Sequence, residues 1–137
     1  MYLLDTNIFL EYLLGQEKGK DVLDFLNASD TSRIWVTDFS LHSIGVLFTR
    51  LNRIHNYQKF IQIDIQANGI GILTLQPDEL SVLVNAITTY NLDFDDAYQY
   101  SIAQCHNLSI ISYDHDFEKT PEGKIEPKQV LMENRDN

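Results

Sequence analysis

The sequence predicts an α/β fold in which a mostly parallel sheet lies between two layers of helices. Two observations support this prediction. Short apolar runs alternate along the chain with longer segments whose apolar residues recur at helical spacing. Strands that alternate with helices are joined by crossovers and therefore pair in parallel. The chain has 137 residues, 44% of them hydrophobic, and is expected to form a single domain over residues 1–137.

Four short apolar segments are predicted as strands, because turn or polar residues flank each of them. The segment "GIGILTL", for example, begins at Gly69 and is followed by Pro77. A shorter apolar run near the C-terminus is expected to add an edge strand over residues 129–132. The four main predicted strands cover residues 2–4, 33–37, 69–75 and 108–112.

The segments between these strands show helical periodicity. Pro77 suits the first turn of the helix that it opens. Residues 56–66 are also predicted as a helix, although "FIQIDIQ" alternates as a strand would. The other predicted helices cover residues 8–13, 17–28, 39–53, 77–90 and 94–105.

The chain is strongly acidic, with 20 acidic against 10 basic residues and a formal net charge of -10. This balance argues against binding to nucleic acid or to an anionic membrane through overall electrostatic attraction. It does not exclude a nucleic-acid substrate, because a cluster of acids that binds a divalent cation accounts for part of the excess.

The single cysteine, Cys105, cannot form an internal disulfide, which fits a reducing compartment. We expect it to be a small buried apolar residue. No segment is long and apolar enough to span a membrane, and Asp5 interrupts the first apolar stretch where a signal peptide would continue. A cytoplasmic location without membrane contact is therefore expected.

Several aspartates stand at the ends of predicted strands or at the start of a helix. Asp5 ends the first strand, and Asp114 follows the strand "LSIIS". The carboxyl ends of parallel strands lie on one edge of a sheet, which is also where ligands bind in such folds. Asp93, Asp95 and Asp96 surround the start of the helix that leads into that later strand. The sequence thus places two groups of acids near the same edge.

Each acid alone has a structural explanation. Asp5 is suited to cap the first helix, acids in a first helical turn favour the helix dipole, and Asp114 and Asp116 are common turn residues. Carboxylates that converge on one edge nevertheless repel each other unless a cation offsets them. Their oxygen ligands suit Mg²⁺ or Mn²⁺ better than zinc, and no histidine or cysteine cluster competes with them.

Three motifs together resemble a known family. The segments "LLDTN", "LDFDDA" and "ISYDHDF", in this order, resemble PIN-domain nucleases, especially the VapC-like ribonuclease toxins of type II toxin–antitoxin systems. The resemblance covers nearly the whole chain and implies a PIN-like three-layer α/β/α sandwich. It also implies a Mg²⁺-dependent (or Mn²⁺-dependent) endoribonuclease that acts on RNA, with a cognate antitoxin protein as partner. A small toxin-like domain with many aromatic residues is further expected to form a homodimer, with the first two helices as the contact surface.

The resemblance also assigns the site residues. Asp5, Asp96 and Asp114 match the family's catalytic and metal-binding acids, and Asp96 is preferred over its neighbours because it directly precedes Ala97. The further assignments are Asp93 and Asp116 as additional metal ligands, and Thr6, Asn7 and Ser112 as supporting residues.

The chain departs from the family where a glutamate is usual, early in the helix after the second strand. Ser43 takes that place, beside His42, and both are retained as supporting residues of the site. Asp38 and Glu11 are further acids that could reach it. The missing acid supports a second hypothesis, a degenerate PIN-like domain that binds protein or RNA without cleaving it.

Two further features leave alternatives open. The basic segment "TRLNRIHNYQK" could contact RNA phosphates or an acidic partner, or be a solvated helix face. Tyr100 could stack on a base. A phosphotransferase of the haloacid-dehalogenase type is a third functional hypothesis, but it requires an aspartate where this chain has Asn7.

Overall fold

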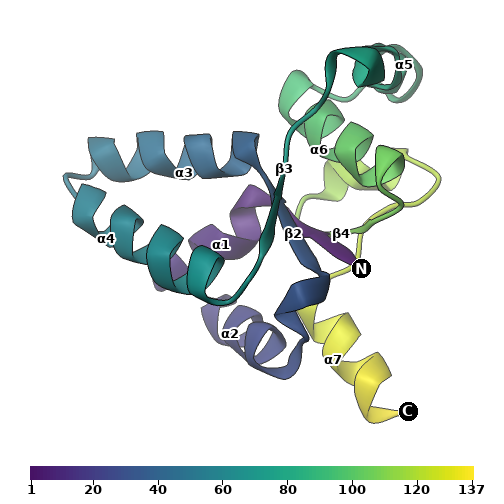
Figure 1. Ribbon diagram of the computed structural model, residues 1–137. Coiled ribbons are helices and arrows are strands. Elements are labelled where there is room, and N and C mark those ends of the chain that lie inside the picture. Colours follow the sequence, from purple (N-terminus) through teal and green to yellow (C-terminus); the bar gives the residue numbers. More distant parts are fainter.

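A four-stranded parallel sheet forms the centre of the computed structural model, which describes residues 1–137 (Figure 1). The strand order is β3-β2-β1-β4, and every neighbouring pair is parallel. β1 pairs with β4 in the register that places Leu4 opposite Ile111, so the expected neighbourhood of these two strands is confirmed. The strands are β1 Tyr2–Leu4, β2 Ile34–Thr37, β3 Gly71–Leu73 and β4 Ser109–Ile111.

Helices connect the strands and cover both faces of the sheet, which confirms the α/β/α prediction (Figure 1). The segment 56–66 is helical, as expected, with a π-helical stretch after its first turns. The helices are α1 Thr6–Leu13, α2 Gly19–Ala28, α3 Asp38–Arg50, α4 Ile54–Lys59, the π-helix η2 Phe60–Ala67, α5 Leu80–Tyr90, α6 Phe94–Cys105 and α7 Pro127–Arg135. Short 3₁₀ turns are η1 Thr31–Arg33, η3 Pro77–Glu79 and η4 His115–Lys119.

Successive strand residues point to opposite faces and thereby supply two separate cores. Leu4 and Ile111 pack into the larger core, under α1, α2, α3, η2 and α7. Leu3 and Ile110 pack into the smaller core, under α5, α6 and η4. Because both faces of the sheet are covered, its strands consist mostly of apolar residues on both sides.

The expected strand over residues 129–132 is wrong, because these residues belong to α7. The start of this helix explains the difference. Pro127 occupies the first helical position, and Glu126 and Gln129 form a reciprocal capping box around it. These local signals outweigh the short apolar run. The residue that does extend the sheet is Ile125, which forms a parallel bridge to Ile111.

Two further observations concern the surface. Cys105 is exposed at the last turn of α6, so the expectation of a buried cysteine is wrong. None of the helices combines the length and the apolar character that crossing a bilayer would require.

Candidate metal centre

The carboxyl edge of the sheet carries aspartates that also cap helices. Asp5 directly follows β1 and accepts the backbone N–H of Thr6 at 2.8 Å, at the start of α1. Asp114 follows β4 and accepts the backbone N–H of Asp116 at 2.9 Å. Asp93 accepts the backbone N–H of Asp96 at 2.9 Å and caps α6. Capping fixes the position of each acid relative to the strand or helix that bears it.

Three of these acids approach each other closely enough to share a cation. One carboxylate oxygen from each of Asp96, Asp114 and Asp116 lies within 4.8 Å of the others. Asp5 is not in this group of three, but it lines the same cavity of about 260 Å³ as Asp96 and Asp114. The complete lining consists of Asp5, Thr6, Asn7, Leu10, Phe39, Ser43, Asp95, Asp96, Gln99 and Asp114.

The charges of this cavity are not balanced by the protein. No lysine or arginine lines it. Asp96 is only 8% exposed, and burial together with the nearby Asp114, Asp93, Asp5 and Asp116 raises the pKa of its carboxyl group to about 8. Oxygen donors that repel each other in this way fit a hard divalent cation such as Mg²⁺ or Mn²⁺.

Asp5 is buried, and its hydrogen bonds partly offset the free-energy cost of removing its carboxylate from water. Burial raises the pKa of its carboxyl group, and the negative charge of Asp114 adds to this, whereas donors from Ser112, Gln99 and Thr6 act in the opposite direction. The Oγ of Ser112 donates to Oδ2 of Asp5 at 2.7 Å, and the side-chain amide of Asn7 donates to the same oxygen at 3.2 Å. Asp5 is therefore held from several elements at once.

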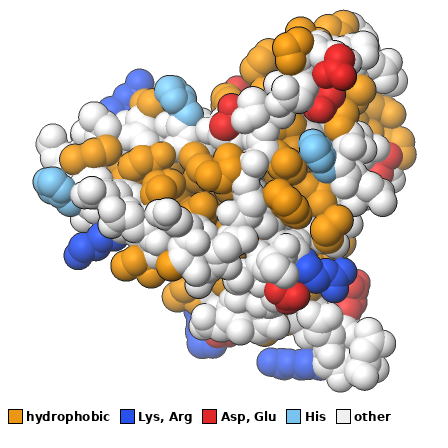
Figure 2. Space-filling model, in the orientation of Figure 1, with side chains coloured by type: hydrophobic (Ala, Val, Ile, Leu, Met, Phe, Trp, Pro, Cys, Tyr) orange, Lys and Arg blue, Asp and Glu red, His pale blue; other side chains and the backbone are white.

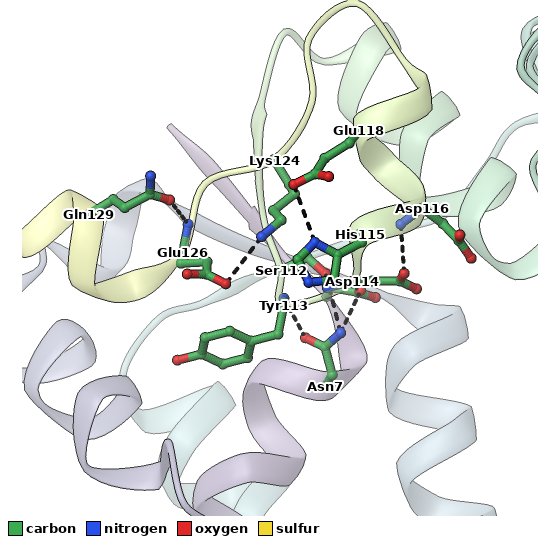
Figure 3. Close-up of polar contacts among 11 residues, drawn as sticks. Asn7, Ser112, Tyr113, Asp114, His115, Asp116, Glu118, Lys124, Glu126 and Gln129 are labelled. Carbon is green, nitrogen blue, oxygen red and sulfur yellow. Dashed lines mark hydrogen bonds and ion pairs between the residues drawn. The ribbon is translucent and has the colours of Figure 1, made fainter.

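Asn7 and Ser112 also join α1 to the loop after β4 (Figure 3). The amide nitrogen of Asn7 lies 3.2 Å from Oγ of Ser112, and its oxygen accepts the backbone N–H of Tyr113 at 3.2 Å. The Oγ of Ser112 in turn accepts the backbone N–H of Asp114 at 2.9 Å. The supporting positions expected for Asn7 and Ser112 thus lie beside Asp5 and Asp114.

Three buried residues of this network were missed by sequence analysis: Thr37, Ser40 and Gln99. Gln99 donates to Asp5 and to Ser40, and Oγ1 of Thr6 lies 2.8 Å from Oγ of Ser40. The one available signal was the position of Gln99, which lies three residues after Asp96 and so shares its helix face.

Of the other expected residues, Ser43 lies in the acidic cavity and His42 does not. Ser43 lines the acidic cavity. His42 is exposed and lines a separate cavity with Val46 and Tyr57, so the structure does not bring it to the carboxylates. Asp38 accepts the hydroxyl of Tyr98 at 2.8 Å.

Glu11 and Tyr100 form hydrogen bonds with residues that do not line the acidic cavity. Glu11 accepts the backbone N–H of Lys18 at 3.0 Å. The idea that Tyr100 stacks on a base is wrong, because Tyr100 is 5% exposed and its hydroxyl donates to Glu122 at 2.8 Å. Its helix face turns toward the smaller core.

The family model of the PIN domain matches residues 2–123. The chain belongs to the PIN domain family. No curated protein sequence matches it.

Solved structures share the PIN fold of this chain. A toxin–antitoxin complex from Klebsiella pneumoniae is 20% identical, with a TM-score of 0.74 over 93% of this chain and 98% of that one. FitAcB from Neisseria gonorrhoeae is 18% identical, with a TM-score of 0.73 over 93% and 99% of the two chains. PAE2754 from Pyrobaculum aerophilum is 16% identical, with a TM-score of 0.67 over 99% and 96%. At these identities the likeness concerns the fold.

The raised pKa of Asp96 makes metal-free stability dependent on pH. The pKa of this carboxyl group is 3.8 in the unfolded chain and about 8 in the folded PIN domain, so the unfolded state ionises first as the pH rises. The contribution of Asp96 to the free energy of unfolding is therefore greatest below its unfolded pKa of 3.8, decreases as the pH rises to its folded pKa of about 8, and is constant above that pH. Asp96→Asn should therefore raise the metal-free melting temperature at about pH 8, by on the order of 3 °C, with a smaller effect at about pH 5.

Thermal melts in a chelator at both pH values measure this difference. Asp78→Asn, an exposed acid at the start of η3, serves as the control and should show no such pH dependence. A loss of stability in Asp96→Asn that is equal at both pH values would contradict the prediction.

Proposed function

We propose that this PIN domain is a Mg²⁺-dependent endoribonuclease, and that it acts as the toxin of a toxin–antitoxin pair. The observation that supports this most is the group of Asp96, Asp114 and Asp116, whose oxygens lie within 4.8 Å of one another at the carboxyl edge of the sheet. Family membership supports a nuclease, and the cavity beside these acids is open to a substrate phosphate.

In this proposal Asp96, Asp114 and Asp116 hold the cation, with Asp5 as a fourth acid behind them and Asp93 at the capping position of α6. A bound Mg²⁺ or Mn²⁺ would supply a Lewis acid that activates water and stabilises the leaving oxygen. Hydrogen bonds within the PIN domain orient the acidic carboxylates before a cation binds. Ser112 and Asn7 keep Asp5 oriented, and the backbone N–H groups of Thr6, Asp96 and Asp116 keep three capping carboxylates in place.

RNA is the proposed substrate class, despite the net charge of -10. A cation bound among the acids reverses the local sign, so that a phosphate can approach an otherwise repulsive cavity. The remaining acids of the chain do not need to contact the substrate. We propose a cytoplasmic location, which is where such an RNA substrate is found.

We also propose an antitoxin and a second copy as partners. Two of the similar structures carry the names of a toxin–antitoxin complex and of FitAcB. Exposed apolar side chains gather along α3, α4 and η2 (Figure 2), where they include Val46, Leu51, Ile54 and Ile63. On the first two helices the only such exposed side chain is Leu23, so α3 to η2 is the better contact surface.

Self-association should therefore depend on the α3–η2 surface. Replacing the 46% exposed Ile54 by aspartate should shift a dimer toward monomer, because a charge would be buried in an apolar contact. Light scattering coupled to size-exclusion chromatography measures the mass. Leu23→Asp on α2 is the matched control and should leave the dimer intact. A wild-type protein that stays monomeric at high concentration would contradict the dimer but not the nuclease.

Cleavage of RNA should require divalent metal and the carboxylates. Asp96→Asn and Asp114→Asn should each lose more activity than the roughly 10–100-fold cost of removing a residue behind the ligands. His42→Ala should retain most activity, because its side chain lies outside the acidic cavity. The assay is cleavage of a mixed-sequence RNA with Mg²⁺, with Mn²⁺ and with chelator.

Two outcomes would contradict this assignment. Wild-type protein that binds RNA without cleaving it under any metal condition would favour the degenerate binding module. Full activity in Asp114→Asn with complete loss in His42→Ala would show that the histidine carries the chemistry.

Ser43→Glu tests whether an additional acid improves the site. Ser43 lines the acidic cavity, so a glutamate at this position is expected to add an anionic ligand and to tighten Mg²⁺ binding. Titration calorimetry should show a lower Kd for Mg²⁺, and the metal-free protein should melt at a lower temperature because repulsion increases. His42→Glu, one residue earlier but facing away, is the matched control. An equal gain in both variants would mean that the effect is general charge rather than ligation.

A further inference from the structure

Gln99 is a buried polar residue on α6 that reaches from this helix to the ends of two strands. Its side chain is 2% exposed. Its Nε2 donates to Oδ1 of Asp5 at 3.1 Å and to Oγ of Ser40 at 2.6 Å, while its Oε1 accepts the hydroxyl of Thr37 at 2.8 Å. Both donor hydrogens and the carbonyl oxygen of the amide are therefore in use.

The direction of this amide follows from its neighbours. The carboxylate of Asp5 only accepts hydrogen bonds, so the NH₂ group of Gln99 must face it. Thr37 accepts the backbone N–H of Ser40 at 3.0 Å as the cap of α3, and its hydroxyl lies 2.8 Å from the carbonyl oxygen of Gln99 and 3.3 Å from Oγ of Ser40, so Gln99 offers the closer acceptor. With Asp5 ionised, the amide nitrogen of Gln99 faces Asp5 and its oxygen faces Thr37.

Gln99 is the donor that links Asp5 to the helix of Asp96. The other donors to Asp5 come from α1 and from Ser112 after β4. Asp96 precedes Gln99 by three residues and lies on the same face of α6. Gln99 therefore ties Asp5 to the helix that bears Asp96, which is repelled by Asp114, Asp93, Asp5 and Asp116.

The amide is chemically suited to a cation site. A lysine or arginine at this position would offset the charge of Asp5 and compete with a divalent cation. A glutamate would add repulsion against Asp5, and an apolar side chain would leave buried acceptors without a donor. A neutral donor holds the carboxylate in place and leaves its charge available.

We propose that Gln99 is a positioning residue of the metal centre: its amide sets Asp5 relative to Asp96 and thereby determines the affinity for the divalent cation. This inference rests on the proposed metal-dependent function. The amide of Gln99 is already engaged by Asp5, Ser40 and Thr37, so it would act on a bound cation through Asp5 and through the hydrogen bonds that tie α6 to Ser40 and Thr37.

The test is Mn²⁺ binding to the metal-free protein, measured by titration calorimetry at a temperature where all variants are folded. Gln99→Met keeps the length of the side chain and removes the amide, and it should weaken Mn²⁺ binding by roughly tenfold or more. Gln104→Met, the same substitution at an exposed position of α6, is the matched control and should bind as wild type.

Ser40→Ala gives a second variant in case Gln99→Met does not fold. It removes an acceptor of the amide, and it should also weaken Mn²⁺ binding. The double variant should be no weaker than Gln99→Met alone, because both changes act through one network.

The results of these measurements distinguish the positioning role of Gln99 from the existence of the metal centre. A Gln99→Met protein that melts earlier but binds Mn²⁺ as tightly as wild type has lost only a structural contact, which would overturn the positioning role. If Gln99→Met is unfolded, wild-type affinity in Ser40→Ala overturns it instead. Wild-type protein that binds no Mn²⁺ would overturn the metal centre itself and the function proposed for it.

Discussion

The buried carboxylate of Asp5 is the constraint on which the rest of the site depends. A charged group that is 7% exposed is costly unless donors surround it, and Asp5 accepts hydrogen bonds from Thr6, Asn7, Gln99 and Ser112. These donors come from α1, α6 and the segment after β4. Satisfying one carboxylate therefore brings together three parts of the chain that are far apart in sequence. The position of the acidic cavity follows from this convergence.

Helix capping and metal binding are compatible uses of the same residues. Asp5, Asp93 and Asp114 each accept a backbone N–H at the start of a helix or 3₁₀ turn. At Asp93 and Asp114 the capping oxygen is Oδ1, which leaves Oδ2 for a cation. At Asp5 both oxygens accept hydrogen bonds from the protein. The cap restricts the rotamer before any ligand arrives, which reduces the entropy lost on binding. Structural and functional explanations of these aspartates are thus not alternatives.

The acidic cavity reduces the stability of the metal-free protein. Burial and neighbouring acids raise the pKa of Asp96 to about 8, which means that its ionised form is disfavoured near neutral pH. The two apolar cores, one on each face of the sheet, provide the stability that offsets the destabilising effect of the acidic cavity. The destabilisation is limited further by the neutral hydrogen bonds of Gln99, Ser40 and Thr37, since an additional charge at these positions would increase the repulsion.

The sequence by itself determined the layered α/β fold and the edge at which the acids gather. Both depend on local patterns, since a short apolar run that ends in Asp5 or precedes Asp114 marks the end of a strand regardless of its neighbours. Only the tertiary structure decided which helix faces meet that edge. The rotation of α3 places Ser43 in the cavity and His42 outside it, and the rotation of α6 buries Gln99 against Asp5 and Tyr100 in the smaller core. These rotations result from packing against residues distant in the chain, which no local pattern of amino acids specifies.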